Sequence, residues 1–168
     1  MVTGVQTCAL PISLPAGTPA ASVTYELAER AGGVGLAADI ANRPGAALLF
    51  NLSGQETWHL VQSLRDDSIV EPGAALPVAF AGPAAVATAV NQGREIVVAP
   101  VNGTATRIKS NLPITANASV STLSFVTPRE GWAIVSGTAC GQVKTDCTAY
   151  SELSSTSDAG ASWTQLGG

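Results

Sequence analysis

Charge is scarce in this 168-residue chain, since charged residues make up only 12% of it and the formal net charge is -4. Such a composition provides no basic stripe, so the electrostatic footprint of a nucleic-acid-binding protein is missing. Aromatic residues are also few, at 5%. Each of the three Trp residues is therefore expected to hold a repeated packing position and serves as a landmark along the chain.

The first residues of the chain stand apart from the rest. Residues 2–13, VTGVQTCALPIS, resemble the in-frame translation of a sequencing adapter. A signal peptide would need a basic start and an apolar core of about 7 to 15 residues, and this segment has neither. We therefore treat residues 1–13 as a non-native tail and residues 14–168 as the protein proper, which is enough chain for one domain.

The nearly uncharged stretch 72–93 is the one place where a membrane-spanning helix has to be considered, because a span needs about 20 apolar residues. Pro77, Gly82 and Pro83 interrupt it, which favours two buried strands, LPVAFA and AAVATAV, joined by a turn. Similar short apolar runs bounded by Gly, Pro, Asn and Ser follow throughout the chain and predict an all-β domain. TYELAERAGG, residues 24–33, is ambiguous between a strand and a helix.

Two segments of the chain align around Trp landmarks. NLSGQETWHLV and TSDAGASWTQL place Trp58 and Trp163 about 105 residues apart, which is two periods of about 52 residues, close to the length of a propeller blade. An intervening strand should then end near residue 110, where TATRIKSNLP lies. In this alignment Thr57 and Trp58 form a degenerate copy of the second segment.

TSDAGASW, carried by Thr156, Asp158, Gly160 and Trp163, resembles the Asp-box of bacterial neuraminidase repeats. Together with the preceding FVTPREGWAIV, it is similar to the propellers of photosystem II assembly factors. The resemblance implies an incomplete β-propeller of about three four-stranded antiparallel blades, approximately 14–66, 67–115 and 116–168. Because propellers close with four to eight blades, we expect a piece of a larger protein, with two blade faces or edges that further blades would cover.

We interpret the box as a turn rather than a catalytic group. Asp158 at a hairpin corner can accept hydrogen bonds from backbone amides two or three residues on, and Gly160 supplies the positive φ of a tight turn. An anion stabilised in this way is poorly suited to donate a proton. The copy at residues 51–58 has Ser53 in place of the Asp and keeps its Trp.

Cys140 and Cys147 remain once Cys8 is set aside with the tail. Their spacing across a polar loop between two predicted strands favours a disulfide over two free thiols. A bridge would indicate an exported protein in an oxidising compartment, extracellular or periplasmic. A zinc site is disfavoured because the only His, His59, is distant in sequence.

Sialidases that resemble this repeat use an arginine cluster, a Tyr nucleophile with a Glu, and an Asp acid/base. Here the Arg residues are scattered, Tyr150 and Glu152 are the only adjacent Tyr and Glu pair, and LPVAFA and STLSFV, expected as first strands, carry no charge. We interpret the acidic run Asp66, Asp67 and Glu71 as a hydrated loop. We therefore expect a non-catalytic scaffold without cofactor or metal that binds a protein or carbohydrate. A sialidase-like glycoside hydrolase propeller is the alternative.

Overall fold

The computed structural model describes residues 23–30, 33–40, 46–52, 59–65, 76–82, 85–100, 102–141 and 146–167. Within them the chain is all-β and forms three four-stranded antiparallel sheets. In each sheet, strands that follow one another in sequence are paired. The all-β class predicted from the alternation of apolar runs and turn residues is confirmed.

The strands of each sheet follow in chain order. The first sheet contains β1 (Val23–Arg30), β2 (Gly33–Ile40), β3 (Ala46–Leu52) and β4 (His59–Arg65). The second contains β5 (Val78–Phe80), β6 (Ala85–Val90), β7 (Glu95–Pro100) and β8 (Thr106–Lys109), with the 3-10 helix η2 (Asn91–Gly93) between β6 and β7. The third contains β9 (Ala118–Phe125), β10 (Gly131–Cys140), β11 (Cys147–Thr156) and β12 (Thr164–Gln165).

Two sequence expectations are settled by these elements. The stretch with Pro77 and Gly82 forms the two strands β5 and β6, as predicted. The ambiguous segment TYELAERAGG supplies β1, which pairs with β2 from Val23↔Ile40 to Arg30↔Gly33. Its helix-forming residues are in a strand because pairing with a neighbour outweighs intrinsic propensity.

Within the ranges that the structure describes, no helix is long and apolar enough to cross a membrane.

Strands β5, β6 and β7 of the second sheet are largely buried on both faces, and this produces two apolar cores. Since strand side chains alternate between faces, Val86 points to one core and Ala87 to the other, and each is 0% exposed. The first core joins the first and second sheets and contains Ala37, Leu64, Leu76, Val78, Phe80, Val86, Val90, Val97 and Ala99. The second core joins the second and third sheets and contains Ala79, Ala81, Ala87, Ala89, Ile96, Leu112, Ala118, Val120, Leu123, Phe125, Ala133, Val135 and Trp163.

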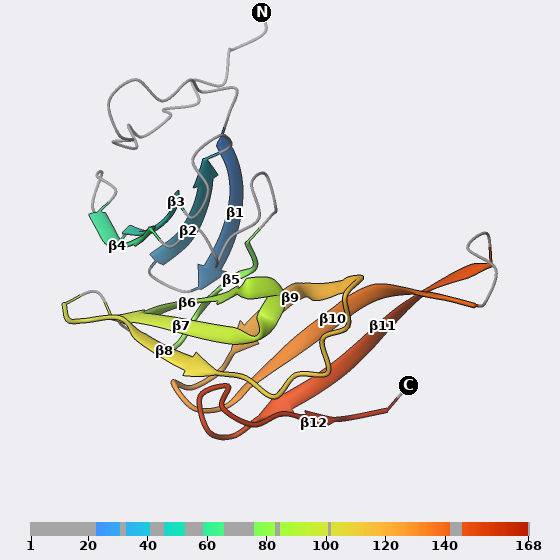
Figure 1. The fold of residues 1–168 in the computed structure, drawn as a ribbon. Helices are drawn as coiled ribbons and strands as arrows, with labels where there is room; N and C mark the ends of the chain where they lie inside the picture. The colour runs from blue at the N-terminus through green and yellow to red at the C-terminus, as the bar shows by residue number, and fades with distance from the viewer. Residues whose placement is uncertain are drawn as a thin grey trace, which may run out of the picture.

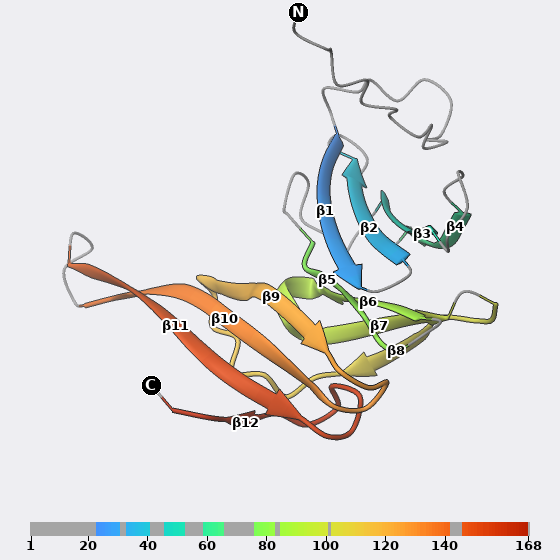
Figure 2. The ribbon, with the colours of Figure 1, turned by 180° about the vertical axis from the view of Figure 1, so that it is seen from behind.

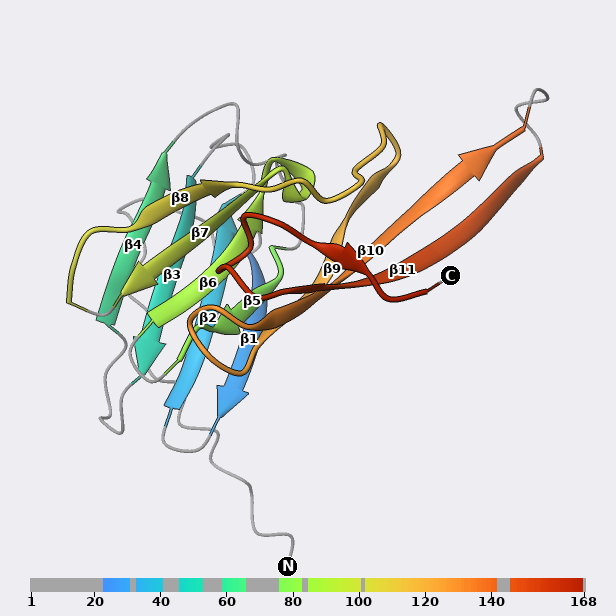
Figure 3. The ribbon, with the colours of Figure 1, turned by 90° about the horizontal axis from the view of Figure 1, so that it is seen from below.

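The first strands of the three sheets are neighbours. Strand β5 lies between β1 and β9, as both side views show (Figure 1 and Figure 2). From below, β10 and β11 extend beyond the rest of the third sheet as a long hairpin (Figure 3). The first strands therefore bring backbone and side chains from all three sheets to one place.

Replacing Ile96 by Ala tests the second core. Ile96 is fully buried between the second and third sheets, so Ile96→Ala should lower the free energy of unfolding by about 2 to 5 kcal/mol. Denaturant unfolding followed by circular dichroism measures the change. The exposed Val126 provides a control, because Val126→Ala should change stability by less than about 0.5 kcal/mol. Equal effects of the two variants would contradict the packing.

Candidate functional site

The Asp-box is a corner that follows β11. The Thr156 hydroxyl donates to Asp158 Oδ1 at 2.9 Å and accepts from the Gly160 amide at 3.0 Å. It also accepts from the Asp158 amide at 3.3 Å. One buried hydroxyl therefore organises the first half of the turn.

The Asp158 carboxylate organises the second half. It accepts from the Ser162 amide at 2.8 Å and from the Ser162 hydroxyl. The stronger amide donor is thus four residues along the chain, and the Ala161 amide, three residues along as expected from sequence, contributes less. Ala159 and Gly160 both have positive φ, 65° and 94°, which curls the segment back toward the carboxylate.

These hydrogen bonds fix the charge of the corner. The Ser162 hydroxyl contributes most, followed by the Ser162 amide and the Thr156 hydroxyl, and together they lower the pKa of Asp158 from 3.8 to about 2. Hydrogen bonds to the charged form of a carboxyl favour that form. Asp158 is therefore an anion at neutral pH with its acceptor positions directed into the turn.

The corner also joins the third sheet to the second. Gly160 is buried, and a Cβ there would lie 2.9 Å from Cγ1 of Ile96. The Trp163 indole donates to the Gly160 carbonyl at 2.8 Å and packs edge-on against Phe125, with ring centroids 6.4 Å apart. The Trp163 amide donates to Oδ1 of Asn111, before β9, at 2.7 Å. The degenerate copy, Thr57 and Trp58, lies outside the described residues.

The charge of Asp158 predicts an acid-sensitive stability. Because its pKa is lowered in the folded state, its contribution is present above pH 3.8 and is lost as the pH falls through about 2. Asp158→Asn should therefore be less stable than the wild type at neutral pH, with a gap that shrinks toward pH 2. Denaturant unfolding at several pH values measures the gap.

Direct titration of the Asp158 carboxyl by NMR distinguishes the effect of its lowered pKa on stability from a general loss of packing. Ser162→Ala removes the largest cause of the lowered pKa, so the Asp158 carboxyl of that variant should titrate closer to 3.8. An Asp158 pKa at or above 3.8 in the wild type would contradict the hydrogen bonding described above.

Cys140 and Cys147 form a disulfide at the end of the long β10–β11 hairpin. They are opposite each other in the strand register, with Cα atoms 4.0 Å apart and an S–S distance of 2.07 Å. The pairing predicted from their spacing is confirmed. Neither cysteine belongs to the two cores.

Removal of the bridge gives a test in two parts. Thiol titration of the unreduced, denatured 168-residue chain should find one thiol, that of Cys8, and three after reduction. Cys140→Ser with Cys147→Ser should lower the free energy of unfolding by about 2 kcal/mol, mainly through a less constrained unfolded chain. Three thiols before reduction would exclude the bridge.

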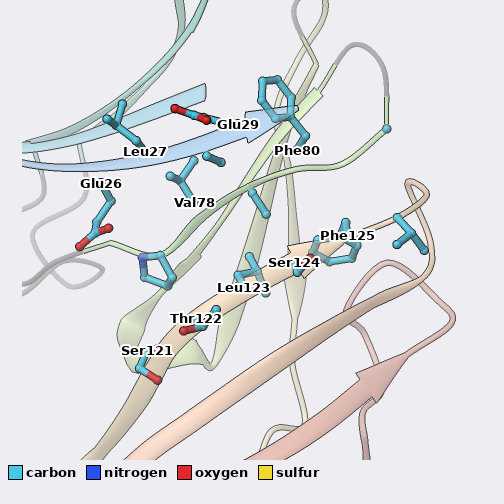
Figure 4. Close-up of a pocket in the computed structure, with 15 residues that line it drawn as sticks. Glu26, Leu27, Glu29, Val78, Phe80, Ser121, Thr122, Leu123, Ser124 and Phe125 are labelled. Carbon is cyan, nitrogen blue, oxygen red and sulfur yellow. The ribbon is translucent and has the colours of Figure 1, made fainter. Parts of the chain in front are cut away.

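A cavity of about 660 Å³ lies among the first strands of the three sheets. β5 contributes an apolar wall that includes Val78 and Phe80, and β9 contributes the hydroxyls of Ser121, Thr122 and Ser124. In Figure 4, Glu26 lies on one side of β1, while Leu27 and Glu29 lie on the other. The cavity therefore combines carboxylates, hydroxyls and an apolar surface.

The sequence reasoning missed the charge at this cavity. Strands β5 and β9 carry none, as expected, but β1 brings Glu26 and Glu29. The segment had been ambiguous between helix and strand, so its carboxylates were not placed with the other first strands. None of the residues described as lining the cavity is Arg, Lys, His or Tyr.

The pair Tyr150 and Glu152 lies elsewhere. Both residues line a separate cavity of about 550 Å³ on the third sheet, and the Tyr150 hydroxyl is 3.3 Å from Oγ1 of Thr115. Being two residues apart on β11, they face the same side, as expected. Asp66, Asp67 and Glu71 lie outside the described residues, within which no group of three or more His, Cys, Asp or Glu could hold a metal.

Comparisons of the chain with protein-family models, with curated proteins and with solved structures find no match.

Proposed function

We propose that the chain is part of an exported, non-catalytic β-propeller of the Asp-box type that acts as a binding or assembly scaffold. Three successive antiparallel meanders with neighbouring first strands support blades arranged around an axis. The corner at Thr156, Asp158, Gly160 and Trp163 supports the family resemblance, because these four residues contact one another and Gly160 lies against Ile96 of the second sheet.

The cavity among β1, β5 and β9 is the observation that carries a binding function. Carboxylate oxygens accept hydrogen bonds and hydroxyls both donate and accept them, while an apolar wall favours the flat face of a ligand. A carbohydrate or a polar segment of a protein fits this combination. We expect Glu26 to orient the ligand, because its side chain lies on the opposite side of β1 from those of Leu27 and Glu29 (Figure 4).

The disulfide supports the compartment in the proposal. Stable structural disulfides belong to oxidising environments, outside the cytosol of most organisms. The Cys140–Cys147 bridge lies at the tip of a hairpin, where reducing agents would reach it. An extracellular, periplasmic or cell-surface location is therefore the one we propose.

A sialidase-like glycoside hydrolase is the second candidate, favoured by the two carboxylates that β1 brings to the cavity. Glycosidases generally need two placed acidic or equivalent groups. The resemblance would also require arginines for the substrate carboxylate and a Tyr nucleophile. The residues described as lining this cavity include neither, so the scaffold remains the better-supported function.

A panel of immobilised oligosaccharides and acidic, basic and neutral peptides tests the proposal. The chain should bind a subset, and Glu26→Gln should weaken that binding about tenfold by removing a charged acceptor. Glu152→Gln, in the separate cavity on the third sheet, is the matched control and should have little effect. Release of the fluorophore from a fluorogenic sialoside would favour the glycosidase. Binding unaffected by Glu26→Gln would contradict the proposed cavity.

A further inference from the structure

The cavity among β1, β5 and β9, which we call the first-strand cavity, is bounded by strand edges. Side chains of a strand alternate between its two faces, so a cavity that lies on one face touches every second residue. Here β1 contributes the consecutive residues 26–29, β5 with the residue before it contributes 77–80, and β9 with the residue after it contributes 121–126. Because both faces of each strand are touched, the cavity lies along the edges of the three strands.

Each of these edges belongs to a terminal strand of its sheet. Among the described strands, β1 pairs only with β2, β5 only with β6, and β9 only with β10. The outer edge of a terminal strand presents a row of backbone N–H and C=O groups, to which an extended peptide can add as a further strand. Strand β1 has eight residues, whereas β5 has three. The edge of β1 is therefore long enough to receive a peptide.

The charge at the cavity favours one class of peptide. Glu26 and Glu29 both line it and both are exposed. No described residue forms an ion pair or a hydrogen bond with either carboxylate. The four basic side chains that the structure describes all lie outside the cavity lining, namely Arg94, Arg107, Lys109 and Arg129. The field of the cavity therefore attracts a cationic ligand and repels an anionic one.

The positions of the two carboxylates define a spacing. Glu26 and Glu29 are three residues apart, so their side chains leave β1 on opposite faces, about 10 Å apart along the strand (Figure 4). In paired strands, residues directly opposite each other point to the same face. The peptide residues opposite Glu26 and Glu29 are thus also three apart. Two basic residues with two residues between them match both carboxylates, whereas a pair with one residue between them lies on one face.

The remaining cavity lining suits the other groups of such a peptide. Leu27 and Val126 are 57% and 61% exposed and provide apolar contacts. The hydroxyls of Thr122 and Ser124 on β9 can both donate and accept hydrogen bonds. The Ser121 hydroxyl is already hydrogen-bonded within the third sheet. A peptide beside β1 would therefore have polar and apolar partners across the cavity.

We propose that the first-strand cavity binds an extended peptide along the outer edge of β1, through two basic residues three positions apart that pair with Glu26 and Glu29. The partner is a protein with Lys or Arg at this spacing in an exposed extended segment. This inference rests on the proposed function and names the ligand class of its site.

Binding of labelled peptides to the whole chain, measured by fluorescence anisotropy, tests the proposal. The first peptide has two Lys residues with two residues between them in a background of Thr and Ser. Its isomer has the same composition with one residue between the Lys residues. The first peptide should bind about tenfold more tightly than the isomer, because only it places a cation beside each carboxylate. A peptide with Gln in place of both Lys residues should bind more weakly than either.

Variants of the chain connect this preference to the two carboxylates. Glu26→Gln and Glu29→Gln should each weaken binding of the first peptide about tenfold. Each should also abolish its advantage over the isomer, since one carboxylate remains for either peptide. Glu152→Gln removes the same charge from the separate cavity on the third sheet and should leave both affinities unchanged. Methylation of the peptide's backbone amides should weaken binding, because it removes donors to the edge of β1.

The outcomes separate this inference from the proposed function. Equal affinity of the two isomers, or an advantage that persists in Glu26→Gln and Glu29→Gln, would overturn the inference. An oligosaccharide or a neutral peptide that binds in a Glu26-dependent way, while the basic peptides do not bind, would overturn it and leave the proposed scaffold intact. If none of these ligands bound, the proposed function would fail together with the inference.

Discussion

The burial of strands β5, β6 and β7 on both faces of the second sheet is the constraint on which the other features depend. Val86 and Ala87 are adjacent, point to opposite sides and are both inaccessible to solvent. Each therefore contributes the full hydrophobic gain of its side chain to a different core. A strand that is apolar on both faces needs a sheet on each side, and this requirement brings β1 and β9 next to β5.

The Asp-box belongs to the same arrangement. A rigid corner is formed by the Asp158 carboxylate, the Thr156 hydroxyl and the two residues of positive φ, Ala159 and Gly160. This corner places Gly160 against Ile96 of the second sheet. Trp163 completes the contact with its indole on the Gly160 carbonyl and its ring beside Phe125. The Asp158 carboxylate is thereby used in holding a turn, while Glu26 and Glu29 line the first-strand cavity.

Sequence reasoning predicted the parts that depend on local pattern. Breakers at Pro77 and Gly82 separated two strands, and the spacing of Cys140 and Cys147 indicated their bridge. It could not decide between helix and strand for residues 24–33, where helix formers are outweighed by pairing with β2. The charge at the cavity was missed for this reason, since Glu26 and Glu29 belong to that segment. The distance from Asp158 to its main amide donor depended on Ala159 taking positive φ, which its residue type does not indicate.

NMR can observe contacts across both faces of the second sheet in one sample and so test whether this sheet is enclosed between the other two. Gly35 lies against the Phe80 ring and Gly160 lies against Ile96. We expect nuclear Overhauser effects from the Gly35 Hα protons to the Phe80 ring and from the Gly160 Hα protons to the Ile96 side chain. If the strand pairings within each sheet were observed and either of these contacts were missing, the second sheet would not be enclosed as described.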